Sequence, residues 1–170
     1  MSFEIETSAE WKALMRANNL TNKVRKEFAR KGALKVKRAI IQDLNKGISP
    51  VKGKGKFPKY SPSYKKEIRK KNSKRMREAN PTKAISPVNL RLTGGLHKSL
   101  RSFLQRNTLI IQFKNFLADI HNNQGAGKSK ILRRLLPTKN GERFNRRIEG
   151  VLFDELKKAV DKVAKQFSGQ

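Results

Sequence analysis

RLTGGLHKSL, residues 91–100, separates two parts of the chain that differ in their sequence patterns. Leu90 and Leu92 alternate with polar neighbours, which indicates a short strand with one buried face. Gly94 and Gly95 follow, and glycine lets the backbone turn sharply at little steric cost. The stretch therefore predicts a strand that ends at a glycine corner and continues into a helical turn.

Two overlapping patterns follow the corner. Leu96, Leu100 and Phe103 recur at spacings of four and three, which is typical of one face of a helix. Residues 108–113, TLIIQF, are rich in β-branched side chains and are the strongest candidate for a strand. Residues 100–104 are their expected antiparallel partner, and the residues between the two segments would form the turn of a hairpin.

The part before the corner is basic and mostly helical. Residues 21–45 predict a long helix because apolar side chains recur at multiples of four. Gly32 interrupts this helix at a cost of about 1 kcal/mol relative to alanine, so it marks close packing or a bend. Gly47 is the expected C-terminal cap. Residues 3–6, FEIE, predict a short strand, and residues 7–15 predict a short helix opened by a capping box.

Three further segments are expected after the hairpin. Residues 115–121 predict a short helix, and residues 131–136, ILRRLL, predict another strand. Residues 145–167 form a clear amphipathic pattern and predict a closing helix. The apolar side of the short helix is expected to contain Phe116, Leu117 and Ile120. The apolar side of the closing helix is expected to contain Ile148, Leu152, Leu156, Val160, Val163 and Phe167.

The charge balance is very uneven. The 170 residues contain 41 Lys and Arg against 13 Asp and Glu, a formal net charge of +28. A free domain with this charge repels itself, so an anionic partner or acidic neighbouring subunits are expected. Nucleic acid, an acidic protein surface and anionic lipid are the candidate partners.

Several classes of protein are disfavoured by the composition. The chain has no cysteine, which excludes disulfides, thiolate zinc sites and a cysteine nucleophile. The first residues are acidic and lack an apolar segment, so no signal peptide is expected. No apolar run approaches the roughly 18 residues of a membrane span, so no membrane partner is expected.

Residues 48–88 differ from the rest of the chain and are expected to project from the core. They contain five of the six prolines and few large aliphatic side chains. Within residues 50–79, twelve Lys and Arg face two Glu. Ser61 and Pro62 are good residues for a helix start, so residues 63–71 predict a helix. Phe57, Tyr60 and Tyr64 lie among these cations, a mixture suited to phosphate contact with some base stacking; the alternative is a solvated surface or a contact to acidic subunits.

Motifs for catalysis and cofactors are weak. GAGKS, residues 125–129, resembles the end of a phosphate-binding loop, but Asn122 stands where the full pattern needs glycine. Asp119 and His121 are two potential metal ligands without a third, and His97 is the only other histidine. Carboxylates are few and scattered, so no catalytic, cofactor or metal site is predicted and an enzyme is not expected.

The residues expected to contact partners or DNA lie in two basic loops, at about 52–77 and 128–147. They are Lys52, Lys54, Lys56, Lys59, Lys65, Lys66, Arg69, Lys70, Lys71, Lys74, Arg75, Lys128, Lys130, Arg133 and Arg134.

Four sequence blocks occur in an order typical of one protein family. They are KGKGKFPKYSPSYKK at 52–66, RLTGGLHKSL at 91–100, FLADIHNNQG at 116–125 and LLPTKNGERF at 135–144. A long helix precedes them and an amphipathic helix follows. Over roughly residues 20–165 the chain resembles the virion-morphogenesis or tail-completion (neck) proteins of tailed bacteriophages. It departs from them at Leu117, where an aromatic residue is usual, and in the stretched spacing between Pro137 and Arg143.

The resemblance implies one α+β domain over residues 1–170, with a small antiparallel β-sheet packed by a long N-terminal helix and a C-terminal amphipathic helix. Long basic loops would project from it, chiefly at about 48–88. It also implies a structural virion protein, assembled in the host cytoplasm, that forms a homo-oligomeric ring, commonly of six subunits. Its partners would be the neighbouring neck, connector and tail proteins and the phage DNA in the channel.

Two other functions stay open from the sequence. A tail terminator, the related ring that caps the tail tube, has nearly the same sequence pattern. A basic nucleic-acid-binding protein would explain the charge without a ring, and it predicts steeply salt-dependent DNA binding by the monomer.

Overall fold

The computed structural model describes residues 2–5, 18–70, 85–90, 94–105 and 108–168. The predicted helix at 7–15 lies outside these ranges. The elements in chain order are β1 (Ser2–Ile5), α2 (Asn18–Glu27), the π turn η1 (Phe28–Gly32), α3 (Ala33–Asn45), α4 (Pro62–Lys70), α6 (Gly95–Lys98), β2 (Leu100–Gln105), β3 (Thr108–Phe113), α7 (Leu117–Asp119), the π turn η2 (Ile120–Gln124) and α8 (Arg146–Ser168).

A three-stranded antiparallel sheet has the order β1-β3-β2. The predicted hairpin is confirmed: Leu100 pairs with Phe113 and Leu104 pairs with Leu109. Leu109, Ile111 and Phe113 are buried, because alternate residues of β3 point to the face of the sheet that the helices cover. The predicted strand near the N-terminus is confirmed as β1.

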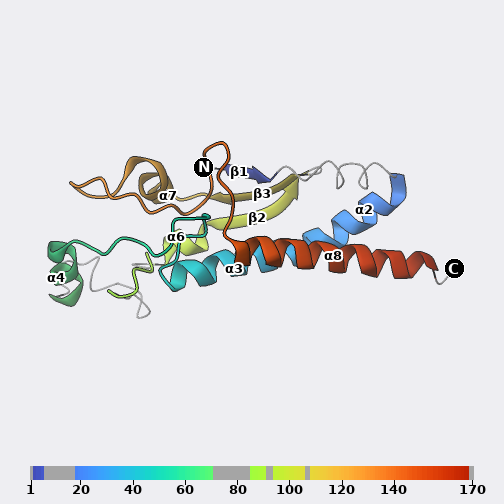
Figure 1. Cartoon of the computed structure of the whole chain (residues 1–170), viewed down its shortest axis with the longest axis horizontal. Coiled ribbons are helices and arrows are strands. Elements are labelled where there is room, and N and C mark those ends of the chain that lie inside the picture. Colours follow the sequence, from blue (N-terminus) through green and yellow to red (C-terminus); the bar gives the residue numbers. More distant parts are fainter. Residues whose placement is uncertain (1, 6–17, 71–84, 91–93, 106–107, 169–170) are drawn as a thin grey trace.

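The long N-terminal helix is confirmed as α2, η1 and α3 in continuous succession (Figure 1). In η1 the Ala33 amide donates to the Phe28 carbonyl oxygen, five residues back, which defines the π turn. The helix then packs on the sheet, where the Ser102 hydroxyl donates to the Ala33 carbonyl oxygen over 2.8 Å. Gly47 has φ +69 and ends the helix as predicted.

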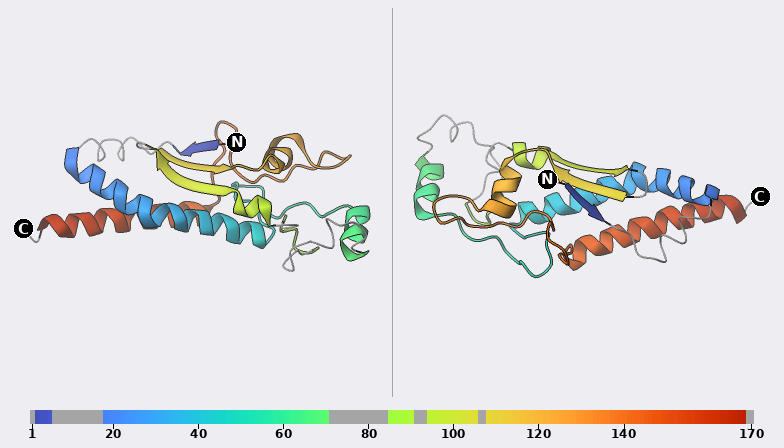
Figure 2. Two further views of the ribbon diagram at one scale, coloured as in Figure 1. Left: turned by 180° about the vertical axis from the view of Figure 1, so that it is seen from behind. Right: turned by 90° about the horizontal axis from the view of Figure 1, so that it is seen from above.

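The closing helix α8 lies beside α3 on the same face of the sheet, as the rear and upper views show (Figure 2). Asn145 caps its start by accepting the Ile148 amide over 3.1 Å. Three ion pairs join α8 to the first helix: Lys35 meets Glu155 at 2.7 Å, Lys162 meets Glu27 at 2.9 Å, and Arg147 meets Asp43 at 2.6 Å. Among the described side chains of α8, at residues 146–166, the buried ones are Ile148, Glu155, Ala159 and Val163; the predicted apolar residue Phe167 lies outside them.

Several local predictions are wrong. Residues 131–136 are not a strand, because the Leu135 and Leu136 amides donate to the Asn122 side chain and not to a neighbouring strand. Leu100 starts β2, and therefore Leu100 and Phe103 do not continue the helix of Leu96.

Phe116 is 73% exposed, whereas Ala118 is the fully buried residue of its helix. In the corner itself, Leu90 has φ +52 and residues 85–90 form no strand, while residues 91–93 lie outside the described ranges. Gly94 has φ +80, a left-handed conformation that favours glycine.

The fold is therefore α+β: a small antiparallel sheet packed by the long N-terminal helix and the C-terminal amphipathic helix, with long basic loops. Helix α4 and the loop that follows α7 lie at the end of the molecule opposite to the C-terminus, whereas the loop that leads into α8 lies nearer the middle (Figure 1).

Candidate partner-binding surface

The basic arm, defined here as residues 52–70, carries eight Lys and Arg against Glu67 alone. Seven of the eight cations are exposed and Lys65 is half-buried. The predicted basic residues placed by the structure on this arm are Lys52, Lys54, Lys56, Lys59, Lys65, Lys66, Arg69 and Lys70. Lys71, Lys74 and Arg75 lie outside the described residues.

A tight loop at residues 48–56, called the glycine loop below, leads from the core into the arm and overlaps its first residues. The Ser49 amide donates to the Gly55 carbonyl oxygen over 2.7 Å, and Ile48 bridges to Lys56. Gly53 and Gly55 have φ +77 and +57, which side-chain-bearing residues rarely adopt. The glycines therefore allow a turn that brings three lysines to the surface within five residues.

The middle of the arm is fixed to the core by aromatic side chains. Phe57 and Tyr60 are both buried. Tyr64, at the start of α4, contacts Tyr60 edge to face with ring centroids 5.0 Å apart. These rings stabilise the arm, so the prediction that Phe57 and Tyr60 offer faces for base stacking is wrong.

Helix α4 is confirmed close to the predicted bounds. The Ser61 hydroxyl accepts the Tyr64 amide over 3.3 Å and so caps the helix that starts at Pro62. None of its nine described residues is fully buried, and only Tyr64 and Ile68 pack against the core. The helix therefore presents most of its surface, with four cations, to solvent.

Arg133 is a buried residue that attaches the arm to the core. Its guanidinium donates to the Pro58 and Lys59 carbonyl oxygens, each over 3.3 Å, and lies 5.3 Å from the centre of the Tyr60 ring. Burial lowers the pKa of Arg133 and raises the pKa of Tyr60 to about 12. The Tyr60 hydroxyl accepts the Leu90 amide over 3.2 Å, which ties the arm to the glycine corner.

Arg134 forms a second internal anchor. Its guanidinium donates to the Asn122 carbonyl oxygen over 2.6 Å and forms an ion pair with Glu142 at 2.5 Å. The Ser49 hydroxyl donates to the Arg134 carbonyl oxygen over 2.7 Å. Arg133 and Arg134 are only 4% and 8% exposed, so the prediction that they contact partners is replaced by a structural role.

Asn122 completes the anchor and is fully buried. Its side-chain oxygen accepts the Leu135 amide over 2.6 Å and the Leu136 amide over 3.0 Å. Its side-chain nitrogen donates to the Thr138 hydroxyl over 3.0 Å. In the sequence, Asn122 stands out only as a departure from a phosphate-loop motif. Its structural role could not be predicted, because it depends on the tertiary fold that brings residues 122 and 135 together.

The GAGKS segment is a tight turn and not a phosphate loop. It follows a helix, and the Ala126 amide and Ile131 carbonyl oxygen bridge its two ends over 2.9 Å. Gly125 has φ +87, and a Cβ there would lie 2.2 Å from the Lys130 carbonyl oxygen. Lys128 and Lys130 are exposed on this turn, apart from the arm in sequence.

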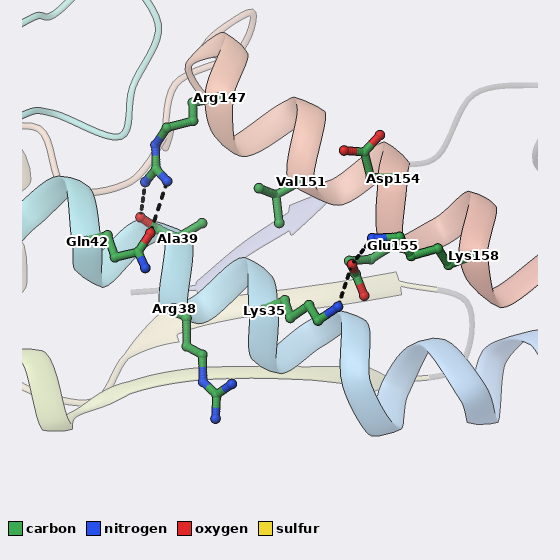
Figure 3. A pocket seen from close by; sticks show the side chains of 9 residues that line it. All are labelled: Lys35, Arg38, Ala39, Gln42, Arg147, Val151, Asp154, Glu155 and Lys158. Carbon is green, nitrogen blue, oxygen red and sulfur yellow. Dashed lines mark hydrogen bonds and ion pairs between the residues drawn. The ribbon is translucent and has the colours of Figure 1, made fainter.

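A shallow pocket of about 310 Å³ lies between α3 and α8 (Figure 3). Lys35 and Lys158 converge on Glu155 at one end, and the hydrogen bond from Lys35 lowers the pKa of this carboxyl. Arg147 donates to the Ala39 carbonyl oxygen and the Gln42 side chain at the other end. Lys35 and Lys158 are thus paired with Glu155, and Arg147 is paired with Asp43 of α3, so these charges join the two helices.

Within the described ranges, no three His, Asp or Glu side chains are grouped to hold a metal ion. Asp119 accepts the Asn123 and Gln124 side chains over 2.8 and 2.5 Å. Among the described helices, none is long and apolar enough to cross a membrane.

Comparison with known proteins identifies no relative of this chain: no family model, curated protein or solved structure matches it. The structure itself defines the class, an α+β protein that carries an exposed basic arm on buried polar anchors.

Proposed function

We propose that the chain is a structural subunit of the neck of a tailed bacteriophage, forming a ring between head and tail around the DNA channel. Neighbouring neck and tail proteins are its partners, and it assembles in the host cytoplasm and stays in the virion. The proposal starts from the ordered sequence blocks at 52–66, 91–100, 116–125 and 135–144.

The observation that carries the proposal is the way these blocks meet in space. The Lys52 amide of the first block donates to the Arg143 carbonyl oxygen of the fourth over 2.9 Å. Asn122 of the third block accepts two amides of the fourth. Leu90, next to the second block, donates to Tyr60 of the first. Short motifs far apart in sequence therefore build one structural unit, which supports treating their shared order as more than coincidence.

The shape and charge agree with such a role. A scaffold of helices and sheet, in which residues 148–168 of α8 carry four Lys against four Asp and Glu, supports a basic arm at the opposite end (Figure 1). An exposed arm that is already held in place by buried anchors presents a preformed surface to a neighbour, which lowers the entropy cost of docking in successive rings.

Deletion of the coding sequence from the phage or prophage that carries it tests the proposal, with electron microscopy of the particles as the readout. We expect filled heads and free tails of normal length that do not join. Tails of abnormal length would instead identify a tail terminator, because an uncapped tube continues to grow. Normal particles would contradict both roles and favour a nucleic-acid-binding protein outside the virion.

A further inference from the structure

The glycine loop lies against a second loop, residues 137–145, that is far away in sequence. The Lys52 amide donates to the Arg143 carbonyl oxygen over 2.9 Å, and Val51 bridges to Phe144. The Asn145 amide donates to the Pro50 carbonyl oxygen over 2.7 Å. In the right panel of Figure 2, which is seen from above, the loop that follows α3 turns beside the start of α8.

This junction gathers exposed cations from both loops and from the first residue of α8. We call them the two-loop basic surface: Lys52, Lys54, Lys56, Lys139, Arg143 and Arg146. Within the described part of the chain none of the six forms an ion pair. Their charge is therefore available to a partner.

The acidic groups near the junction point inward. The Glu142 carboxylate accepts the Thr138 amide over 3.0 Å and pairs with buried Arg134. Asp43 is buried and accepts Asn145 over 2.7 Å and Arg147 over 2.8 Å. The fold thus separates the two signs of charge and leaves the surface of the junction basic.

Apolar groups at the junction are buried as well. Val51, Phe57 and Phe144 are each less than a tenth exposed. A specific interface with a folded protein usually has an apolar or aromatic centre, and single-stranded nucleic acid usually needs aromatic faces for stacking. A basic surface without either feature fits a regular line of phosphates.

We infer that the two-loop basic surface binds the phosphate backbone of duplex DNA, without reading its sequence. The inference rests on the neck proposal in one respect only: the DNA would be the phage DNA in the channel. Lysine and arginine contacts to roughly four to six phosphates give a slope of about −4 to −5 in log Kobs against log salt.

The test is fluorescence anisotropy of the purified chain with a labelled duplex across a salt series. The variant Lys52→Gln, Lys54→Gln, Lys139→Gln and Arg143→Gln removes four charges of the surface. The control Arg101→Gln, Lys114→Gln, Lys157→Gln and Lys165→Gln removes the same net charge from exposed positions elsewhere. Melting curves of both variants verify that they fold.

We expect the surface variant to bind at least tenfold more weakly and its salt slope to be less negative by about 3.6, since each of the four lost phosphate contacts contributes about 0.9. The control should change affinity by less than threefold. Equal losses in both variants would mean that net charge, not this surface, holds the DNA, and would overturn the inference.

A competition experiment distinguishes DNA from an acidic protein as the partner. Unlabelled duplex should displace the probe at least tenfold better than polyglutamate of equal total charge. Equal displacement would overturn the assignment to DNA. Neither result depends on joined heads and tails in particles, so failure of this inference and failure of the neck proposal are distinguishable.

Discussion

Gly32 leaves room for the ring of Phe28 in the π turn. A Cβ at position 32 would lie 2.5 Å from two carbons of this buried ring. Alanine is favoured over glycine in a helix by about 1 kcal/mol, but overpacking a core costs about 1–3 kcal/mol. We expect Gly32→Ala to lower the free energy of unfolding by about 1 kcal/mol in urea denaturation.

Gly150 in α8 provides the matched control. A Cβ at this position would meet no atom within 4 Å. Gly150→Ala should therefore raise the free energy of unfolding, by up to about 1 kcal/mol. A similar gain in the Gly32 variant would show that the Phe28 ring moves aside freely and that the glycine is not needed for packing.

Glu142 makes the stability of the second loop depend on pH. Burial raises the pKa of its carboxyl, but hydrogen bonds from the Thr138 amide, the Arg134 guanidinium and the Lys139 amide outweigh burial, and the net pKa lies below 4.5. The unfolded chain therefore takes up the proton first as the pH falls, so stability is lost below about pH 4.5.

We expect Glu142→Gln to lower the free energy of unfolding by about 2 kcal/mol at pH 7, because Arg134 loses its buried partner. The difference from the wild type should shrink as the pH falls toward 3, since protonation removes the same charge from the wild type. Urea denaturation at several pH values measures this. Glu149→Gln is the control: this carboxylate forms no ion pair among the described residues, so its loss should change the free energy of unfolding at pH 7 by less than about 0.5 kcal/mol.

At the scale of elements, the arm depends on its attachment by Arg133. The planar guanidinium contacts two carbonyl oxygens of the arm and the Tyr60 ring at once. A lysine ammonium cannot reproduce this geometry. We expect Arg133→Lys to speed amide hydrogen exchange in residues 57–70 by tenfold or more.

The sheet and α8 should exchange as in the wild type, because they do not rest on this contact. Arg143→Lys, at an exposed position, is the control and should leave exchange in the arm unchanged. Equal protection of the arm in both variants would show that its aromatic residues alone hold it in place.

Elements with long, regular patterns were predictable from sequence. The hairpin followed from β-branched residues 108–113, and the two long helices followed from their periodicity. Residues 131–136 look like a strand but are fixed by hydrogen bonds to Asn122 and to the His121 carbonyl oxygen. Such side-chain contacts compete with sheet formation and leave no periodic trace in the sequence.

The candidate surface was predictable only in part. The lysines of the glycine loop and α4 are exposed as expected, apart from half-buried Lys65, because charged side chains rarely lose their water without a partner. Arg133 and Arg134 have such partners inside the fold, and the sequence ILRRLL does not indicate which groups these partners are. The meeting of Lys52 with Arg143 requires the tertiary fold and could not be read from either loop.

At the scale of the whole molecule, four of the few acidic residues are engaged in ion pairs inside the fold. Glu27, Asp43, Glu142 and Glu155 each pair with Lys or Arg of the fold. The surface field is therefore governed by the arm and the loops, where exposed cations greatly outnumber acids. A surface of this kind steers anionic partners from a distance, and the effect weakens as salt screens it.

The arm should be needed for docking and not for folding. We expect Lys65→Glu, Lys66→Glu and Lys70→Glu together to abolish incorporation into particles while the melting temperature changes by less than 3 °C, since these positions are at least partly exposed on α4. Lys114→Glu, Lys157→Glu and Lys165→Glu is the control with equal charge change. Normal incorporation of the α4 variant would exclude α4 as a docking surface.

The π turn η1 also bears on how the length of this chain can vary. A five-residue turn inside an α-helix accommodates one residue more than a regular turn. A shortened variant lacking one exposed residue of residues 28–32 could close the gap as ordinary helix, and α2 would keep nearly the same side toward α8, because the wide turn had absorbed the extra residue. Glu27 would still face Lys162 on α8. A one-residue deletion in the regular helix of α3 would instead rotate α2 by about 100° relative to the rest of α3, so the π turn is the place where this long helix can change its length without a compensating change in α8.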